Sequence, residues 1–528
     1  MARPRPRTAV TASVALLAAI ACAGHQWTAA EGARILAVET VAARSHWNFM
    51  SAVLRSLTAA GHQVTAFTPF PDEGGGGVNY TAVDTSAQCQ MLTATDPALM
   101  VASFGGPVAL MRTLPAFCQN HCDVVMRHPR FDAIMRNQNA PAAGVAPFDL
   151  VIMEPLAVDC MSHVAHTLSL PIVYAIPSPM ITYAEREFTG HVSHPACVSN
   201  LIAGHAVPRT FVQRFTNNML LVYTMVVREF RNRLLRFTDP RPYDASPVVR
   251  PSVIFQNSFH GTEAPRPVLP NVVDVGGIHL EPAKTIPADI LDFIEKSTHG
   301  VIYFTFGSTV KISSLPKHII NTFKEVLAQV PQRVLWKYED EMKDLPKHVM
   351  IKKWLPQRDI LLHPKVKLFI SHGGISGVYE ALDAGVPVLG FPMFYDQPRN
   401  LDNLVIAEMA ITMDLFTVAN DTLLNNILKL INDKKYAKNA KIASNRFKDR
   451  VISPEKLVVY WTEYVIRHRG APHLKYHGYN LTWYQYFLLD VIADAVTTSI
   501  FILFVMYKFL KFIFNFFFKF LSNEKVKI

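Results

Sequence analysis

The segment from Val366 to Phe391 constrains the fold more than any other stretch of this chain. It predicts a buried strand (VKLFIS, 366–371), a glycine-rich turn (HGGISG, 372–377), a helix over 378–384 that ends at Gly385, and a second strand over 388–391. A helix between two strands returns the chain to the starting edge of the sheet, so the two strands lie parallel. Parallel sheets are covered by helices on both faces. The segment therefore predicts an α/β fold.

The same alternation of strands and helices occurs in both halves of the chain. In the first half we expect a helix over 48–60 and strands over 34–39, 64–68, 148–153 and 172–176. In the second half we expect further strands over 301–306 and 334–338. The length of 528 residues allows two or three domains, and the hydrophobic share of 50% excludes a disordered chain. Because proline is dense over 240–270, as is typical of a linker, we predict domains over 25–275 and 276–470.

The two ends of the chain predict membrane targeting. Arginines followed by an apolar run and small residues form a secretory signal peptide, predicted over 1–24, with an uncleaved anchor as the alternative. After a juxtamembrane segment over 471–486, residues 487–507 are long and apolar enough for one membrane-spanning helix. Lysines in the basic tail over 508–528 place that tail in the cytosol and the body in the lumen. We therefore expect a single-pass type I membrane protein.

The net charge of +10 does not predict a nucleic-acid partner, because most of it lies in these terminal segments. A lumenal body agrees with glycosylation sequons at Asn79, Asn420 and Asn480. The C-terminal KVKI is similar to dilysine retrieval signals, with its lysines one position nearer the end, so we expect the endoplasmic reticulum membrane. Loss of Cys22 with the signal peptide leaves an odd number of cysteines, and either free thiols or disulfides fit.

The turn at 372–377 lies between a strand and a helix, where an anionic group can bind. Its glycines let an anion approach the first helical turn, whose free N–H groups and partial positive charge stabilise it. Taken alone, the turn has two interpretations, which are a phosphate site and an αβ turn without a ligand.

A longer pattern separates these interpretations. The segment from Trp354 to Gln397 (WLPQ, FISHGGISGVYE and FYDQ in order), the FGST element over 306–309 and the segment 271–277 resemble the signature of the UDP-glycosyltransferase family. The resemblance covers nearly the whole chain and is strongest to arthropod members. It implies the GT-B fold, in which two Rossmann-like domains with parallel sheets face each other, here with one C-terminal transmembrane helix. It also implies that the first domain binds the acceptor and the second binds a UDP-sugar.

The resemblance assigns the UDP-sugar site to Ser308, Trp354, Gln357, His372, Gly374, Ser376, Glu380, Asp396 and Gln397. Trp354 offers a flat face for uracil, and Gln357 offers a donor and an acceptor. Glu380, expected on the first turn of the helix, would accept from the ribose hydroxyls. The turn and Ser308 would surround the diphosphate, and Asp396 and Gln397 would bind the sugar. Ser376 departs from the Asn of many family members. Some of these residues also have an interpretation without a ligand. Trp354 would be a core Trp, Gln357 a surface amide, Glu380 an acid at the start of a helix and Asp396 a turn-forming Asp.

The catalytic base is expected in the first half. His46 follows the first predicted strand, which puts it at the carboxyl edge of a parallel sheet, where ligands bind. In the family the matching His deprotonates the acceptor hydroxyl, as an imidazole with a pKa of about 6.5 can do. A carboxylate has to stabilise the imidazolium. The family's usual Asp position is occupied by Glu154, and Asp159 is the alternative partner.

These residues predict a single displacement that inverts the anomeric carbon. No Asp-x-Asp triplet, the carboxylate pair of metal-dependent glycosyltransferases, occurs in the sequence, so we expect no metal, no bound cofactor and activity that withstands EDTA. Glucose is the expected sugar, with glucuronate and galactose as the alternatives. The expected acceptor is a small lipophilic molecule with a hydroxyl group, as in the conjugation of xenobiotics and metabolites. A homo-oligomer is left open.

Two other classes of protein also stay open. Because Glu154 and Ser376 depart from the family pattern, a lumenal carrier that binds nucleotide sugar or lipophile without turnover is the alternative. A nicotinamide-dependent oxidoreductase is disfavoured, since no GxGxxG follows the first strand. The segment 219–237 is either an amphipathic helix at the membrane or a packed helix.

Overall fold

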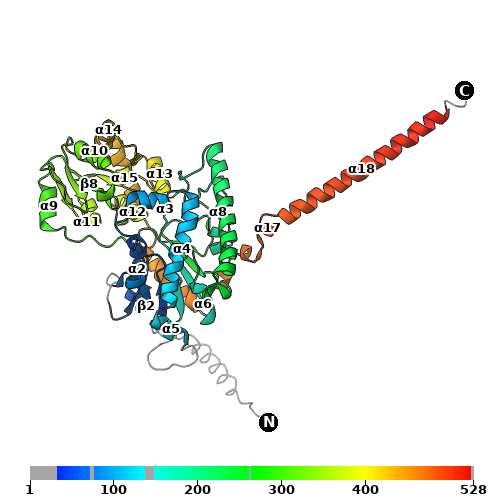
Figure 1. The fold of residues 1–528 in the computed structure, drawn as a ribbon, viewed down its shortest axis with the longest axis horizontal. Helices are drawn as coiled ribbons and strands as arrows, with labels where there is room; N and C mark the ends of the chain where they lie inside the picture. The colour runs from blue at the N-terminus through cyan, green and yellow to red at the C-terminus, as the bar shows by residue number, and fades with distance from the viewer. Residues whose placement is uncertain (1–31, 72–76, 137–147, 261–262, 525–528) are drawn as a thin grey trace, which may run out of the picture. The chain divides into compact units, whose positions relative to one another are not determined.

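The structure is a computed structural model that describes residues 32–71, 77–136, 148–260 and 263–524 (Figure 1). The predicted signal peptide lies outside these residues. The described chain forms two compact units. The body comprises the described residues up to Tyr183 together with Ser193–Leu474, and the tail comprises Ala184–Val192 and the described residues from Lys475 onward.

The body contains two parallel sheets. The first half forms a seven-stranded sheet in the order β3-β2-β1-β4-β5-β6-β7. Its strands are β1 (Arg34–Val38), β2 (Gln63–Thr68), β3 (Tyr80–Asp84), β4 (Leu150–Met153), β5 (Ile172–Ile176), β6 (Val253–Gln256) and β7 (Val272–Asp274). The second half forms a six-stranded sheet in the order β10-β9-β8-β11-β12-β13. Its strands are β8 (Val301–Thr305), β9 (Arg333–Lys337), β10 (Val349–Lys352), β11 (Val366–Ser371), β12 (Val388–Gly390) and β13 (Ala410–Thr412). The predicted α/β fold with two parallel sheets is confirmed.

Helices cover both sheets, as Figure 1 shows for each half. Those of the first half are α2 (Arg44–Ala59), α3 (Pro97–Phe104), α4 (Pro107–Met126), α5 (Pro129–Arg136), α6 (Met161–Thr167) and α8 (Phe211–Thr238). The second half contributes α9 (Ala288–Glu295), α10 (Lys317–Leu327), α11 (Gln357–Leu362), α12 (Ile375–Ala384), α13 (Gln397–Ile406), α14 (Asn420–Asn432), α15 (Lys434–Lys448) and α16 (Pro454–Arg467). The tail contains α7 (Glu185–Thr189), α17 (Trp483–Tyr486) and α18 (Leu489–Glu524).

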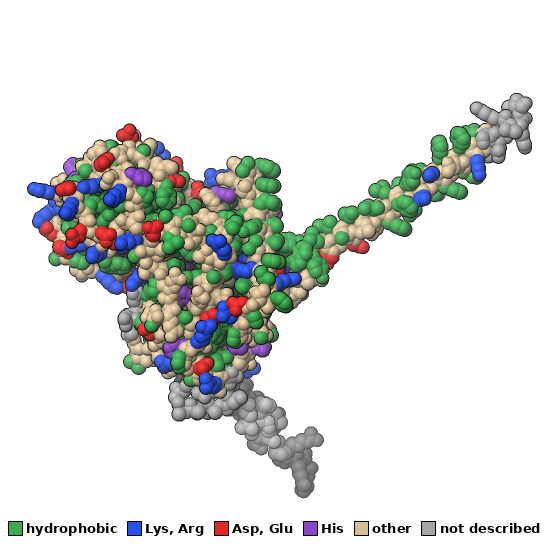
Figure 2. Space-filling model, in the orientation of Figure 1, with side chains coloured by type: hydrophobic (Ala, Val, Ile, Leu, Met, Phe, Trp, Pro, Cys, Tyr) green, Lys and Arg blue, Asp and Glu red, His purple; other side chains and the backbone are tan. Residues whose placement is uncertain are grey.

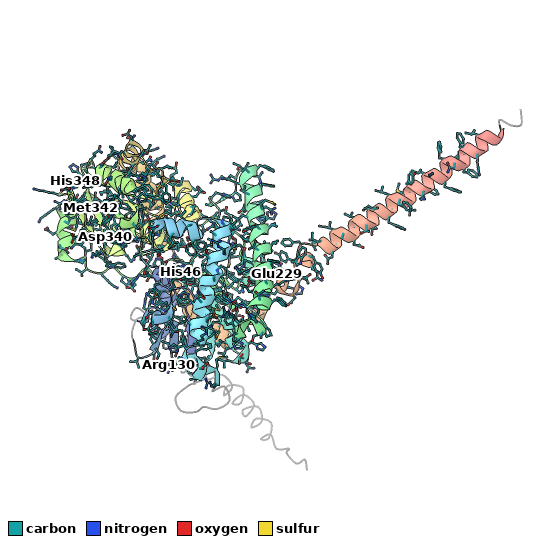
Figure 3. The ribbon with its side chains drawn as sticks, in the orientation of Figure 1. His46, Arg130, Glu229, Asp340, Met342 and His348 are labelled. Atoms are coloured by element: carbon teal, nitrogen blue, oxygen red, sulfur yellow. A yellow bond between two sulfur atoms is a disulfide. The ribbon has the colours of Figure 1, made fainter. Side chains whose placement is uncertain are left out.

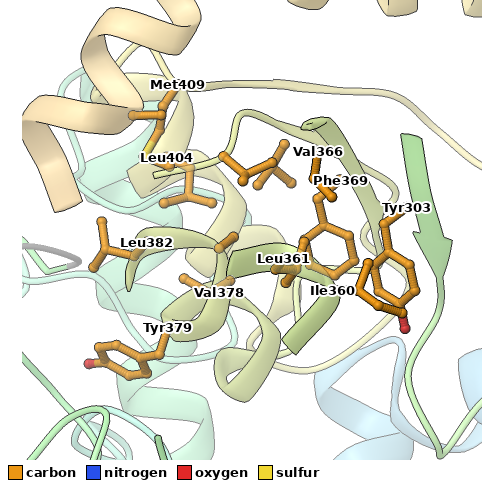
Figure 4. Packing of buried hydrophobic residues seen from close by; sticks show 14 of the residues in the cluster. Tyr303, Ile360, Leu361, Val366, Phe369, Val378, Tyr379, Leu382, Leu404 and Met409 are labelled. Atoms are coloured by element: carbon orange, nitrogen blue, oxygen red, sulfur yellow. The ribbon is translucent and has the colours of Figure 1, made fainter. Parts of the chain in front are cut away.

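Alternation of side chains along β8 explains why both faces of the second sheet need a helical cover. Val301 and Tyr303 belong to one buried cluster, whereas Ile302 and Phe304 belong to another. On the first face the ring of Tyr303 stacks on Phe369 of β11 with 5.5 Å between centroids (Figure 4). Each face of the strand therefore buries apolar surface, which stabilises the sheet by the hydrophobic effect.

One helix crosses between the halves. The first sheet ends with β7, just before the predicted boundary at 275. However, α16 packs on α2 and β6, and its Val458 and Val465 lie in the core of the first half. This differs from the prediction that all of 276–470 belongs to the second domain. A helical pattern identifies the apolar face of a helix but not the core against which that face packs.

The long helix α8 is amphipathic and only partly covered. Leu221, Thr224 and Arg228 are buried, and α8 packs against α4. The other side exposes a continuous apolar stripe, here called the α8 stripe, formed by Phe211, Phe215, Met219, Val222, Val226, Phe230, Leu234 and Phe237. The segment 219–237 therefore belongs to an amphipathic helix that is packed on one face and exposes an apolar stripe on the other.

The tail carries the apolar helix predicted near the C-terminus. Its span Leu489–Lys519 has 31 residues with a mean hydropathy of 2.0, and none of it is buried within the structure. Figure 2 shows apolar side chains along α18. The helix starts at Leu489 rather than at 487 and continues to Glu524 through most of the predicted tail over 508–528. Length and composition therefore fit one membrane crossing.

A disulfide joins Cys122 of α4 to Cys160, the residue before α6. Cys89, Cys118 and Cys197 are free thiols. The bond links two segments that are 38 residues apart, so it restricts the unfolded chain.

Replacement of Cys122 and Cys160 by serine should lower the stability of the full chain in detergent by about 2–4 kcal/mol, because the unfolded state regains freedom. Thermal inactivation measures the effect. Cys197→Ser, at an exposed free thiol, is the control and should leave the midpoint unchanged. Equal midpoints for the double variant and the control would contradict the disulfide.

Candidate active site

The site forms where the strand order of each sheet reverses. These switch points lie between β1 and β4 in the first sheet and between β8 and β11 in the second. Ligands of open α/β sheets bind beyond the carboxyl ends of strands at such points. His46 follows β1 and Glu154 follows β4, whereas Ser308 follows β8 and Gly374 follows β11. The two switch points thus supply most of the predicted site.

A cavity of about 270 Å³ lies between the two halves of the body. His46 lies among the packed side chains there (Figure 3). The predicted site residues that line the cavity are His46, Ser308, Trp354, Gln357, His372, Gly374, Ser376, Asp396 and Gln397. Glu154, Asp159 and Glu380 are not among its lining residues. The structure therefore brings nine of the predicted residues to one chamber.

Backbone hydrogen bonds connect the halves beside the cavity. Ala94 N donates to Ser308 O at 2.9 Å, and Thr95 N donates to Thr309 O at 2.7 Å. Lys311 N donates back to Thr95 O at 2.9 Å. These bonds fix the loop after β8, and with it Ser308, against the first half.

The turn before α12 offers a neutral imidazole and free N–H groups. α12 begins at Ile375 with Gly374 as N-cap, so its first amides point toward the cavity end. A Cβ at Gly374 would lie 2.5 Å from His372 Nε2, so only glycine leaves room for the ring. Burial, and then the charge of Lys337, lowers the pKa of His372 to about 4. His372 is therefore neutral at pH 7, and its Nδ1 has no partner among the described residues.

The predicted uridine end combines an exposed ring with a half-buried amide. Trp354 is 63% exposed, and the Arg44 guanidinium lies 5.7 Å from its ring centroid. Gln357 accepts from Tyr303 OH at 3.4 Å and donates to Glu380. Burial raises the pKa of Glu380 to about 7. Trp354 is thus a surface ring available for stacking rather than a core Trp.

Glu380 corrects one expectation. Because α12 begins at Ile375 and not at 378, Glu380 lies on the second turn of the helix and not on the first. Ile375 and Gly377 are buried, which explains the early start, since this part of the turn packs on the core rather than facing water. Glu380 reaches the cavity through Gln357.

The predicted sugar end is built on a strained loop. Tyr395 has φ of +55°, a conformation that a non-glycine residue seldom adopts. The neighbouring Asp396 accepts from Asn400 Nδ2 at 2.8 Å, and burial raises the pKa of its carboxyl. Gln397 Oε1 accepts from Met393 N at 2.9 Å, so a bond from Gln397 to a sugar would come from Nε2.

The first half supplies a paired imidazole. His46 Nδ1 lies 2.7 Å from Glu154 Oε1, and Glu154 is 1% exposed. Burial lowers the pKa of His46, although the neighbouring acids Glu39 and Asp396 oppose this effect. A neutral ring that donates from Nδ1 to Glu154 keeps Nε2 as its basic nitrogen. Asp159 is bonded elsewhere, to Ser162 N at 3.0 Å and to Tyr174 OH at 3.2 Å.

An apolar wall lies on the same side of the cavity as His46. It consists of Met100, Phe104, Leu110, Leu114 and Leu156, mainly from α3 and α4. Such a wall suits a lipophilic molecule that is held beside the base. Within the described part of the chain, no group of three or more His, Cys, Asp or Glu residues is placed to hold a metal ion.

Glu39, Arg44 and Lys337 were not among the site residues predicted from the sequence. Arg44 and Lys337 line the cavity and Glu39 is buried behind it. Glu39 was expected only as the last residue of a strand. In the structure β1 ends at Val38 and β4 at Met153, so Glu39 and Glu154 each come directly after their strand.

Comparison with known proteins identifies the class. The profile described as UDP-glucoronosyl and UDP-glucosyl transferase matches residues 33–524. UDP-glucosyltransferase 2 of Dactylopius coccus is 34% identical over 94% of this chain and 96% of its own length. UDP-glucuronosyltransferase 2C1 of Oryctolagus cuniculus is 31% identical over 88% of this chain and 95% of its own. Among solved structures, the glycosyltransferase SnogD from Streptomyces nogalater covers 82% of this chain and 99% of its own, with a TM-score of 0.52 and 16% identity, which supports the fold alone.

The fold and the site therefore define a GT-B glycosyltransferase. The chain belongs to the UDP-glycosyltransferase family and is an enzyme that transfers a sugar from a UDP-sugar. Its C-terminal apolar helix and its relatives fit a single-pass membrane protein.

Trp354→Ala should weaken UDP binding by about tenfold to a hundredfold, because stacking of a base on an aromatic ring is worth about 1–3 kcal/mol. Trp354→Phe should retain most of the affinity. Titration calorimetry on the full chain measures both. Phe416→Ala removes another exposed ring of the second half and is the control. UDP affinity that does not change in Trp354→Ala would exclude the stacking role.

Proposed function

We propose that this enzyme transfers glucose from UDP-glucose, with inversion and without a metal ion, to a hydroxyl group of a small lipophilic acceptor. His46 is the base and Glu154 its partner. The observation that carries the proposal is the 2.7 Å contact between His46 Nδ1 and buried Glu154, at a cavity whose opposite side is the N-terminus of α12. A base and an anion site thus face the same space.

The proposed reaction is one displacement. His46 Nε2 takes the proton of the acceptor hydroxyl while its oxygen attacks the anomeric carbon. The bond from that carbon to the diphosphate oxygen breaks on the opposite face, and UDP leaves. Glu154 stabilises the imidazolium that forms. The N–H groups of the α12 N-terminus and neutral His372 stabilise the charge on the diphosphate, with Ser308 beside them.

The charges of the cavity support a neutral hexose as the donor sugar. Among the described lining residues, only Arg44 and Lys337 carry a fixed positive charge. Arg44 lies over Trp354, and Lys337 Nζ donates to Gly307 O at 2.7 Å, beside the loop assigned to the diphosphate. Asp396, which interacts electrostatically with His46, is an acid at the sugar end. A uronate carboxylate would lie near this acid, and Arg399, a cation that acts on Asp396, is already paired with Glu263.

Membrane attachment supports lipophilic acceptors. The apolar wall beside His46 belongs to α3 and α4, and α4 is packed against α8, whose stripe is exposed. A basic amphipathic helix of this kind suits a bilayer surface, from which lipophiles can partition. Conjugation of xenobiotics and metabolites is the corresponding role.

The proposed location is the endoplasmic reticulum, with the body in the lumen. The Cys122–Cys160 disulfide supports an oxidising compartment. Glycosylation at Asn79, Asn420 and Asn480 is part of this proposal. Asn480 is exposed, whereas Asn420 Nδ2 donates to Glu325 at 2.7 Å.

His46→Ala should reduce kcat by about 10²–10⁴-fold while the affinity for UDP stays unchanged, because the imidazole acts on the acceptor. In the wild type, kcat/KM should fall as the pH drops through the pKa of His46, which burial holds below its usual value, since only the neutral ring accepts a proton. Transfer to a panel of phenols, with and without EDTA, measures these effects. A carrier would bind UDP but show no transfer in the wild type, and His46→Ala would then change nothing.

UDP-glucose should be used at least about tenfold better than UDP-glucuronate in kcat/KM, because the uronate charge meets Asp396. UDP-galactose, a neutral epimer, is the control that separates charge from shape. Initial rates with the three donors and one acceptor measure this difference in kcat/KM. A preference for UDP-glucuronate would contradict the assignment of glucose.

A further inference from the structure

Two glutamates occupy equivalent positions on neighbouring strands at the first switch point. β1 and β4 pair in parallel register, with Val38 opposite Met153. Glu39 and Glu154 are the next residues on their strands, so the sheet places them side by side. The backbone also links the two strand ends, since Thr40 Oγ1 donates to Glu154 O at 2.6 Å.

Both carboxyl groups are almost completely removed from water. Glu39 is 2% exposed and Glu154 is 1% exposed. Glu39 Oε1 accepts from Val41 N at 3.0 Å, and Glu154 Oε1 contacts His46. Glu39 Oε2 and Glu154 Oε2 have no hydrogen-bond partner among the described residues. One proton between these two oxygens would satisfy both of them, since a protonated carboxyl donates and a carboxylate accepts.

Two buried charges of the same sign at neighbouring positions repel strongly, so one shared proton is the stable state. Among the described residues, the ion-pair partner of this pair is His46, which is itself neutral in the resting enzyme. The other titratable groups that act on the pair are Cys118 of α4 and Tyr395 of the loop after β12. Burial keeps both of these groups in their uncharged forms by raising their pKa values. None of them supplies a fixed positive charge.

We propose that Glu39 is a positioning residue for sugar transfer: its carboxyl group keeps the proton and donates it to Glu154, which stays ionised toward His46. The inference rests on the proposed roles of His46 and Glu154. Burial raises the pKa of both acids, and the charge of Glu154 raises the pKa of Glu39 further, whereas the hydrogen bond from Glu39 lowers that of Glu154. Glu154 Oε1 lies 2.7 Å from His46 Nδ1, which can donate to a carboxylate, so the ionised form is assigned to Glu154 and the proton to Glu39.

The protonation state of Glu154 determines which tautomer His46 adopts. Ionised Glu154 accepts a hydrogen bond from Nδ1–H, which leaves Nε2 free to take the proton of the acceptor. Protonated Glu154 would instead donate to Nδ1, and Nε2 would carry a hydrogen and could not act as a base. Glu39 thus acts on the reaction through two hydrogen bonds in series.

Two substitutions separate the hydrogen-bond donor from the shape of the side chain. Glu39→Met removes the donor, so Glu154 binds a proton more readily. We expect the acid limb of kcat to move up by about one to two pH units, which is the effect of one hydrogen bond to a buried charge, while KM for the UDP-sugar stays unchanged. Glu39→Gln keeps a donor toward Glu154 and an acceptor for Val41 N, and should restore the wild-type acid limb.

Asp383→Asn is the matched control for loss of a buried acid. Asp383 pairs with Arg358 at 2.9 Å in the second half. This variant should lose stability without a shift of the acid limb. The inference is overturned if the profile of Glu39→Met coincides with that of the wild type, or if Glu39→Gln is impaired as much as Glu39→Met.

A measurement without turnover tests the same point if Glu39→Met does not fold. Infrared difference spectra at neutral pH should show one protonated carboxyl group in the wild type that Glu39→Gln lacks, with UDP affinity equal in both. Identical spectra would overturn the inference. Failure of the wild type to transfer any sugar would refute the proposed function alone, because the spectra do not depend on transfer.

Discussion

The site depends on one property of parallel sheets, which is that the carboxyl ends of all strands lie at the same edge. Each sheet reverses its order once near its middle, and the loops that leave the central strands diverge there to opposite faces. Because the second half repeats this arrangement, the carboxyl ends of β1, β4, β8 and β11 all contribute to one cavity. Chemistry that needs a base on one side and an anion site on the other is therefore divided between the halves.

Burial has opposite effects on the acids and bases around this cavity. It lowers the pKa values of His46 and His372 and raises those of Glu39, Glu154 and Asp396. In each case burial favours the neutral form of the group, since a charge in a poorly solvated site is costly. The two histidines differ only in their partners. A carboxylate faces His46, whereas His372 Nδ1 is left unpartnered beside Gly374. The first arrangement suits a proton acceptor, and the second suits a neutral ligand of an anion.

The sequence was sufficient for features that depend on local pattern. Short apolar runs identified β1, β4, β8 and β11, because each is buried on both faces and carries few polar residues. The resemblance and the spacing also indicated nine of the residues that line the cavity. The start of α12 was wrong by one turn, since the glycine-rich segment has the composition of a loop whereas Ile375 and Gly377 are buried in the helix. The partner of α16 was missed because a helical pattern identifies an apolar face but not the core against which it packs.

Glu39 illustrates a limit of a different kind. Its partnership with Glu154 follows from the pairing of β1 with β4, which are separated by more than a hundred residues in the chain, and no local pattern contains this pairing. The register also explains why a glutamate can replace the family's usual aspartate at position 154. A glutamate carries its carboxylate one methylene further than the family's usual aspartate and needs a group to hold the second oxygen. A neutral carboxyl at the equivalent position of the next strand supplies that group without adding a charge. The two glutamates are therefore best understood as one unit, in which the acid that faces the imidazole depends on its neighbour for its charge.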